Sequence, residues 1–221
     1  EVSGKTILAP DKWELIPISV EKSADSPEMQ IAQFCKRYCE VRGIEPANFF
    51  FDARGTLAVA LARVWSPDVN VVDFGGVPSD RPVSNDEYVW DGDNAKRLKT
   101  CSEHYFNFVT ELWFSFHYAV IGGQIRSLDR EVAREFFRRT WNLVGKNKIQ
   151  VEPKREMKER TLQSPDLADA NVILLEGARR LGFEIGSSRS LHLVTSEDYL
   201  LRELAKFEKM RKASSLKYDT A

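Results

Sequence analysis

Short apolar runs typical of strands alternate along this chain with longer stretches of helical periodicity. Residues 48–52 read Asn-Phe-Phe-Phe-Asp, a continuous apolar run that ends on an acid, and Val69 to Phe74 form a second such run. Between the two runs, apolar residues recur at helical spacing from Leu57 to Val64. The order strand, helix, strand predicts a right-handed parallel crossover. Asp52 is therefore expected at the carboxyl edge of a buried strand, where open α/β sheets bind their ligands.

The same patterns predict the remaining elements. In chain order these are a hairpin over 5–20, a Ser26-capped helix to about Gly43, a loop over 75–93, a long aromatic helix from Asn94, a short strand over 124–128 and a helix capped by Asp129. The last helix carries a basic stripe made of Arg130, Arg134, Arg138 and Arg139. A solvated helix face is the expected role of that stripe.

Two carboxylates lie three residues apart in the segment Ser164-Pro165-Asp166-Leu167-Ala168-Asp169-Ala170. Ser164 is a good N-cap and Pro165 suits the first helical position, so Asp166 and Asp169 are expected to share one face of a helix. Apolar residues then recur at helical spacing, at Leu167, Ala170, Leu174, Ala178 and Leu181, and Gly182 ends the run. Acids at a helix N-terminus also complement the helix dipole, so this spacing alone leaves a purely structural role open.

Basic residues precede this acidic pair. A strand-like stretch over 148–154 ends on Lys154 and is followed by Arg155, Lys158 and Arg160. Two acids facing several bases suit a divalent cation with a phosphodiester beside it. The sequence therefore favours nucleic acid over sugar or peptide as the ligand.

Composition limits the class of protein. The chain has 221 residues, of which 43% are hydrophobic, enough for a full core. Its formal net charge of -1 gives no overall attraction to DNA or membranes, so any basic surface is local. The three cysteines do not form a disulfide framework, and free thiols in a reducing cytoplasm are expected. No apolar run is long enough to span a bilayer and no signal-peptide layout is present, so no membrane partner is expected.

Five segments in order resemble the nuclease domain of the large terminase subunit of tailed bacteriophages. They are Asp52-Ala53-Arg54-Gly55, Glu111-Leu112-Trp113, Gly122 to Leu128, Val151-Glu152-Pro153-Lys154 and the Ser164 to Ala170 motif. The resemblance extends from about Gly4 to Gly182, and the Ser-Pro-Asp-x-Ala-Asp-Ala motif is its most specific part. It implies an RNase H-like α/β fold over residues 1–195, with a mixed sheet of about five strands and helices on both faces. A C-terminal helix and basic tail over 196–221 would follow.

The resemblance also implies a function and a site. Asp52 and Asp169 match the family's catalytic metal-binding acids, and Asp166 is expected to be a nearby ligand or second-shell carboxylate. Lys154, Lys158 and Arg160 are expected to bind phosphate. Two Mg²⁺ or Mn²⁺ ions about 4 Å apart would activate a water and stabilise the departing 3′ oxygen. The substrate would be concatemeric double-stranded viral DNA in the cytoplasm of the bacterial host. The expected protein partners are the terminase ATPase domain, the small terminase subunit and the portal.

One departure from the family keeps other functions open. The family's first catalytic acid lies on a strand before the hairpin, and this chain begins after that position. The expectation is therefore a nuclease domain that lacks its first strand. The alternatives are a catalytically incomplete module that binds DNA or docks on the portal, and another RNase H-like nuclease such as a resolvase.

Overall fold

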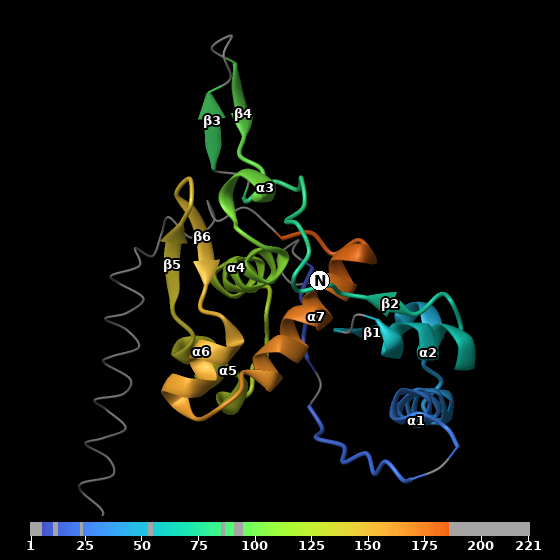
Figure 1. The fold of residues 1–221 in the computed structure, drawn as a ribbon. Coiled ribbons are helices and arrows are strands. Elements are labelled where there is room, and N and C mark those ends of the chain that lie inside the picture. The colour runs from blue at the N-terminus through green and yellow to red at the C-terminus, as the bar shows by residue number, and fades with distance from the viewer. Residues whose placement is uncertain are drawn as a thin grey trace, which may run out of the picture.

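The computed structural model describes residues 6–10, 13–22, 24–52, 55–84, 87–90 and 95–185. Within these ranges the chain is a mixed α/β protein with seven α-helices and three sheets of two strands each (Figure 1). The predicted α/β class is confirmed, but the described ranges do not show the expected sheet of about five strands. The predicted tail over 196–221 lies outside them. None of the described helices is both long and apolar enough to cross a membrane.

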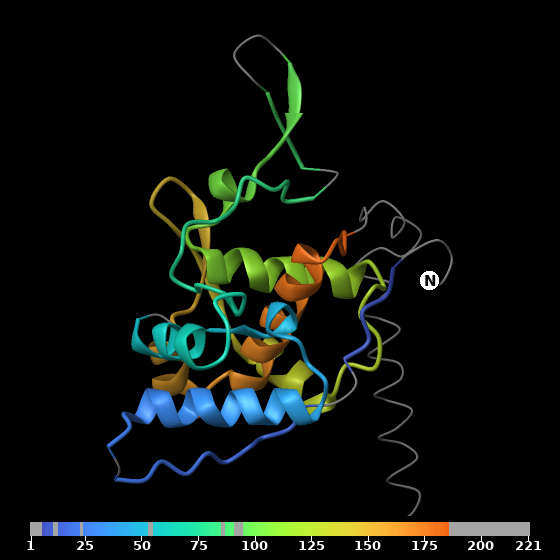
Figure 2. The same ribbon diagram turned by 90° about the vertical axis from the view of Figure 1, so that its right-hand side faces the viewer.

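The predicted parallel crossover is present. Strand β1 (Phe50–Phe51) pairs with β2 (Asn70–Val71) in parallel, and α2 (Thr56–Val64) connects them. The short 3-10 helix η1 (Pro46–Asn48) leads into β1. On this side of the molecule α1 (Pro27–Val41) packs against α2 (Figure 2). The predicted Ser26 cap is confirmed, since its side chain accepts a hydrogen bond from the Met29 backbone N–H.

The main core lies between two crossing helices, α4 (Phe108–Ile121) and α7 (Asp166–Arg180) (Figure 1). The core also includes Leu112, Phe116, Val172 and Leu175, which are almost fully buried. Around it lie α5 (Arg130–Arg138), α6 (Lys154–Thr161) and the antiparallel hairpin of β5 (Trp141–Val144) and β6 (Lys148–Val151). The strand predicted over 148–154 is shorter than expected, since β6 ends at Val151 and Lys154 begins α6. Asp129 caps α5 as predicted.

The apolar residues that recur at helical spacing along α7 do not all face the core. Ala168, Val172 and Leu175 point into the core, whereas Leu174 and Leu181 are 42% and 67% exposed. The helix is rotated because it also buries Asp169 and Glu176, and buried carboxylates need partners inside the protein. The pairing of charges, rather than the largest apolar side chains, selects the inward face.

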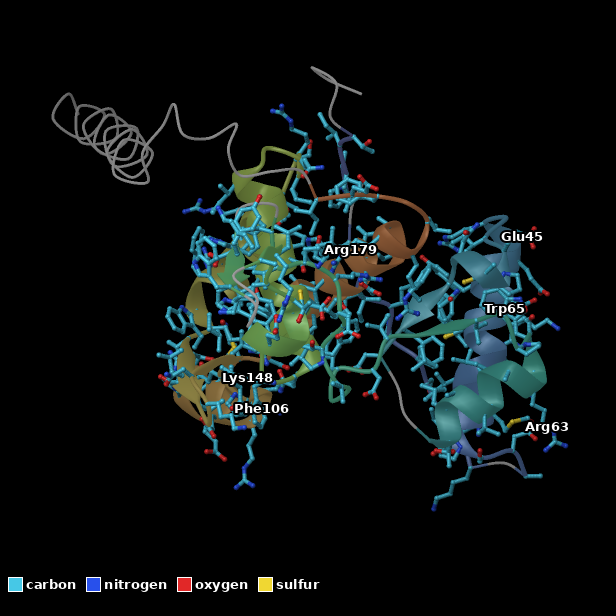
Figure 3. The ribbon with its side chains drawn as sticks, turned by 90° about the horizontal axis from the view of Figure 1, so that it is seen from above. Glu45, Arg63, Trp65, Phe106, Lys148 and Arg179 are labelled. Carbon is cyan, nitrogen blue, oxygen red and sulfur yellow. The ribbon has the colours of Figure 1, made fainter. Side chains whose placement is uncertain are left out.

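An ionic cluster around two buried acids fastens α7 to α4 and to the loop that follows β2. Its members are Glu111, Glu176, Arg81, Arg179 and Arg180, and the side chains of Arg81 and Arg180 are 36% and 33% exposed. Arg81 donates to both oxygens of Glu176, at 2.7 and 3.2 Å, and Arg179 Nη1 lies 3.5 Å from Glu111 Oε1. Figure 3 shows Arg179 between the side that carries Trp65 and the side that carries Lys148.

Glu111 also binds the loop that follows β2. Its carboxylate accepts hydrogen bonds from the backbone N–H and the hydroxyl of Ser79, at 2.6 and 2.7 Å. The side chain of Glu111 is fully buried, so the cost of desolvating its charge is compensated by these bonds and by Arg179.

The predicted hairpin over 5–20 is wrong in the residues described. Residues 13–20 form no strand, and Leu8 instead makes a parallel bridge with Ile125. Two backbone hydrogen bonds hold this bridge, from Leu8 N to Gln124 O and from Arg126 N to Leu8 O. The backbone of Leu8 thus pairs with a segment distant in sequence. A strand was expected over 124–128, and this single bridge is the part of it that forms.

The predicted long helix from Asn94 is interrupted. The structure has β3 (Tyr88–Trp90) pairing with β4 (Lys96–Leu98), then α3 (Cys101–His104), then α4. The β3–β4 hairpin projects from the body (Figure 2), and β3 lies inside the predicted loop. The helix breaks because Tyr105 forms a bridge with Ile149, and Phe106 N donates to Ile149 O at 2.9 Å. Asn107 then caps α4 as a separate helix.

We predict that Gly177→Ala destabilises the fold. A Cβ at Gly177 of α7 meets the ring of Phe50 in β1 at 2.9 Å, closer than carbon atoms approach. Overpacking costs about 1–3 kcal/mol, and the helix propensity of alanine offsets about 1 kcal/mol of that loss. Urea unfolding measures the effect. Phe50→Leu removes the clash, so adding Gly177→Ala to that variant is expected to cause little further loss; an equal loss in both backgrounds would contradict the explanation.

Candidate functional site

Two aspartates follow the ends of the parallel strands. Asp52 comes directly after β1, and Asp73 follows β2 after Val72. The strands run parallel, and Val72 N continues their pairing by donating to Phe51 O at 2.9 Å, so the two acids leave the sheet at one edge. A backbone hydrogen bond from Phe74 reaches the Asp52 carboxylate. Asp52 therefore lies against the end of the neighbouring strand.

The first turn of α7 carries the other two acids, and one lysine joins them. Lys154 Nζ, from the start of α6, lies 2.7 Å from Asp166 Oδ1 and 3.2 Å from Asp169 Oδ2. Burial favours the neutral carboxyl, but the hydrogen bonds from Lys154 and Ser164 lower the pKa of Asp166 overall. The two acids share one face, as their spacing predicted.

Asp169 is the inner member of this pair. Its side chain is 8% exposed, whereas that of Asp166 is 69% exposed. Its Oδ1 accepts hydrogen bonds from Trp113 Nε1 and from Arg139 Nη1, each at 3.3 Å. The guanidinium of Arg139 stacks on the Trp113 ring at 4.5 Å.

Asp52 and Asp169 interact electrostatically across the gap between sheet edge and helix. Partial burial raises the pKa of Asp52, the negative charge of Asp169 raises it further, and Asp73 adds a smaller contribution. The positive charge of Lys154 acts in the opposite direction. The structure thus brings three predicted residues, Asp52, Asp169 and Lys154, within electrostatic reach of one another.

The other two predicted phosphate ligands, Lys158 and Arg160, have different partners from each other. Lys158 lies one turn after Lys154 on α6, and its charge acts on Asp166. Arg160 instead binds Glu152, with Nε to Oε1 at 2.8 Å and Nη2 to Oε2 at 2.6 Å. This ion pair lowers the pKa of Glu152 to about 2. In the structure Arg160 therefore supports the end of β6 rather than facing the acids.

Helix α7 begins one residue later than predicted, and a side chain of another helix accepts a hydrogen bond from its first turn. Pro165 is the N-cap and provides no side-chain acceptor, while the Ser164 hydroxyl donates to Asp166. Glu135 of α5 accepts a hydrogen bond from Ala168 N at 2.8 Å. This contact holds the acidic turn against α5.

Three residues of the site were missed from sequence. Asp73 was detectable, since it follows a predicted strand just as Asp52 does. Arg139 was assigned to a solvated stripe, but its side chain is only 4% exposed, because α5 ends at Arg138 and the chain turns inward. Trp113 was predicted to serve packing, and nothing in the sequence indicates that its indole N–H bonds an acid.

Hard oxygen donors of this kind fit Mg²⁺ or Mn²⁺. Among the residues that the structure describes, however, no three acidic, histidine or cysteine side chains are grouped closely enough to hold a metal ion. Lys154 and Arg139 instead neutralise Asp169. The oxygen donors therefore suit the cation chemically. To bind it, the acids would have to lose their contacts with Lys154 and move closer together.

We predict that Asp52→Asn raises the thermal midpoint of unfolding at pH 7. Because the folded state raises the pKa of Asp52, the ionised carboxylate destabilises the fold above that pKa, and asparagine removes the charge. The gain should disappear below about pH 4, the ordinary range of the group, where aspartate is protonated in both states. Asp68→Asn, in the exposed loop before β2, is the control. An Asp52→Asn midpoint that is unchanged at pH 7 would contradict the destabilisation expected from the burial of Asp52 and the charge of Asp169.

Comparison with known proteins assigns the chain to no family. No protein-family model matches it, and no curated protein matches it. The functional argument therefore depends on the geometry of this acidic cluster.

Proposed function

We propose that this chain is a metal-dependent endonuclease domain that hydrolyses phosphodiester bonds in double-stranded DNA. The observation that carries the proposal is that Lys154 binds Asp169, in the first turn of α7, while the charges of both act on Asp52 at the end of a parallel strand. Acids that repel each other at the edge of a sheet destabilise a fold, so such a cluster is typical of functional sites.

The residues that would hold the cation are Asp52, Asp73, Asp166 and Asp169. A bound Mg²⁺ or Mn²⁺ supplies Lewis-acid activation of a water nucleophile and neutralises charge on the scissile phosphate. The carboxylates orient the reacting groups and balance the added positive charge. Trp113 and Arg139 keep the inner carboxylate in place.

Basic side chains of α6 would hold the DNA backbone beside these acids. Lys154 reaches both Asp166 and Asp169, so its ammonium would contact a phosphate held beside these acids. Lys158 and the exposed Arg155 extend the basic surface along the helix. Contacts of this kind recognise phosphate and carry no sequence information, so we expect weak sequence preference.

The specific biological role rests on the resemblance to terminase nucleases. In that role the domain cuts concatemeric viral DNA in the host cytoplasm, with two metal ions on an RNase H-like sheet. It would work beside the terminase ATPase domain, the small subunit and the portal. The Ser164 to Ala170 motif and its position next to Lys154 support this assignment.

We predict nicking of supercoiled plasmid that depends on Mn²⁺ or Mg²⁺ and is lost in Asp52→Asn and Asp169→Asn. Each substitution keeps the side-chain shape and removes one charged ligand. Loss of second-shell partners typically costs 10-fold to 100-fold, so loss of a ligand should lower the rate by about 100-fold or more. Agarose-gel conversion of supercoiled to open-circular DNA measures the rate.

Asp68→Asn is the matched control and should cut like the unaltered chain. Cutting that survives both site substitutions, or that persists in excess chelator, would contradict the proposal. DNA binding without metal and without cutting would instead support the DNA-clamping alternative.

A further inference from the structure

An apolar groove lies along α4, between that helix and the elements α5 and β5. Its cavity has a volume of about 380 Å³, and most of its lining is aromatic or aliphatic. The lining residues include Trp113, His117 and Val120 on α4, Phe136 and Phe137 on α5, and Trp141 on β5. Phe137 is 89% exposed and Trp141 is 53% exposed. The described part of the chain therefore leaves this groove open, as a surface that another apolar element can fill.

The described chain ends near one end of the groove. Gln124, just after α4, donates from Nε2 to the backbone oxygen of Glu184 at 2.8 Å. Ile185 packs against the main core. Val120, in the last turn of α4, lines the groove. The chain thus leaves the described structure at the same end of α4 that carries Val120.

Residues 196–210, which lie outside the described ranges, carry an apolar stripe of matching length. Ser196 is a good N-cap, and Leu200, Leu204 and Phe207 follow it at the spacing of one helical face. The first and last members of this stripe are seven positions apart, about 10 Å along a helix. The first and last residues that α4 gives to the groove are also seven positions apart. Stripe and groove therefore have the same length.

The link from Ile185 to this segment is long enough to place it in the groove. Residues 186–195 form the link, and ten residues span at most about 33–36 Å when fully extended. Helix α4 has 14 residues and is therefore about 21 Å long. The segment can thus reach every part of the groove without straining the link.

The charges beside the groove and beside the stripe are opposite. Arg130 and Arg134 are exposed and share one face of α5 with Phe137, at helical spacing. Glu203 and Glu208 lie next to the apolar stripe, three or four positions from its members. The basic residues of the segment belong to the opposite helical face, and they are Arg202, Lys206 and Lys209. A helix lying in the groove would therefore bring acids to the basic side of α5 and keep its own bases in water.

We propose that residues 196–210 form an amphipathic helix that docks its apolar stripe in the groove of the same chain. This inference goes beyond the proposed function and does not depend on it. Docking removes the exposed ring of Phe137 from water, which is the main driving force. The docked helix also lies against Trp113 and Arg139, which line the groove and bond Asp169. It therefore covers the candidate site from its inner side.

Hydrogen exchange of the full chain, measured by mass spectrometry at a concentration where it is monomeric, tests the docking. Amides of residues 196–210 should exchange at least about 10-fold more slowly than those of an unstructured peptide of the same sequence. Phe137→Asp puts a charge in the groove and should remove most of this protection. The fold tolerates that substitution, because the ring is already exposed. Leu204→Asp should have the same effect from the other side of the contact.

Each substitution has a matched control. Val59→Asp changes a residue of α2 that is 68% exposed and does not line the groove. Ala205→Asp adds the same acid to the segment, on the helical face away from the apolar stripe. Both controls should keep the protection of residues 196–210.

Three results would overturn the docking. The first is a segment that exchanges like an unstructured peptide in the unaltered chain. The second is protection that survives Phe137→Asp, since the segment would then be ordered elsewhere. The third is protection that appears only at concentrations where light scattering detects dimers, since a second copy would then fill the groove. Plasmid nicking tests the proposed function separately from all three.

Discussion

The need to pair two buried carboxylates on α7 controls how the rest of the structure is arranged. Asp169 and Glu176 lie two helical turns apart on the same face, so both point inward together. A buried carboxylate is tolerated only with partners, and these come from α4, from the end of α5, from α6 and from the loop that follows β2. Their directions fix the rotation of α7. The exposure of Leu174 and Leu181 follows from that rotation.

The same constraint gives the candidate site a buried half and a partly exposed half. The buried half is built from the core outward, because Trp113 and Arg139 belong to packed elements. The partly exposed half is Lys154, which reaches the acids from the start of α6. The partial burial of Asp52 and the nearby charge of Asp169 are a local loss of stability that the large core around α4 offsets.

Local signals predicted the local structure well. The parallel crossover around Asp52 and the caps at Ser26 and Asp129 were correct, because each depends on a few neighbouring residues. Contacts between distant segments were not predictable in this way. The pairing of Leu8 with Ile125 replaced a hairpin that the alternating pattern favoured. The inward turn of Arg139 likewise depends on Asp169, thirty residues later in the chain.

The buried pair of Glu111 and Arg179 has a consequence for how this sequence can vary. Both side chains lie in the interior, so replacing either one alone leaves an opposite charge buried, at a cost of about 3–5 kcal/mol. Glu176 differs, because both Arg81 and Arg180 bind it. Replacing Glu111 and Arg179 together by apolar residues of similar volume avoids the cost. Among natural variants of this chain, these two positions should therefore show correlated replacement, with acid and base lost in concert and seldom singly.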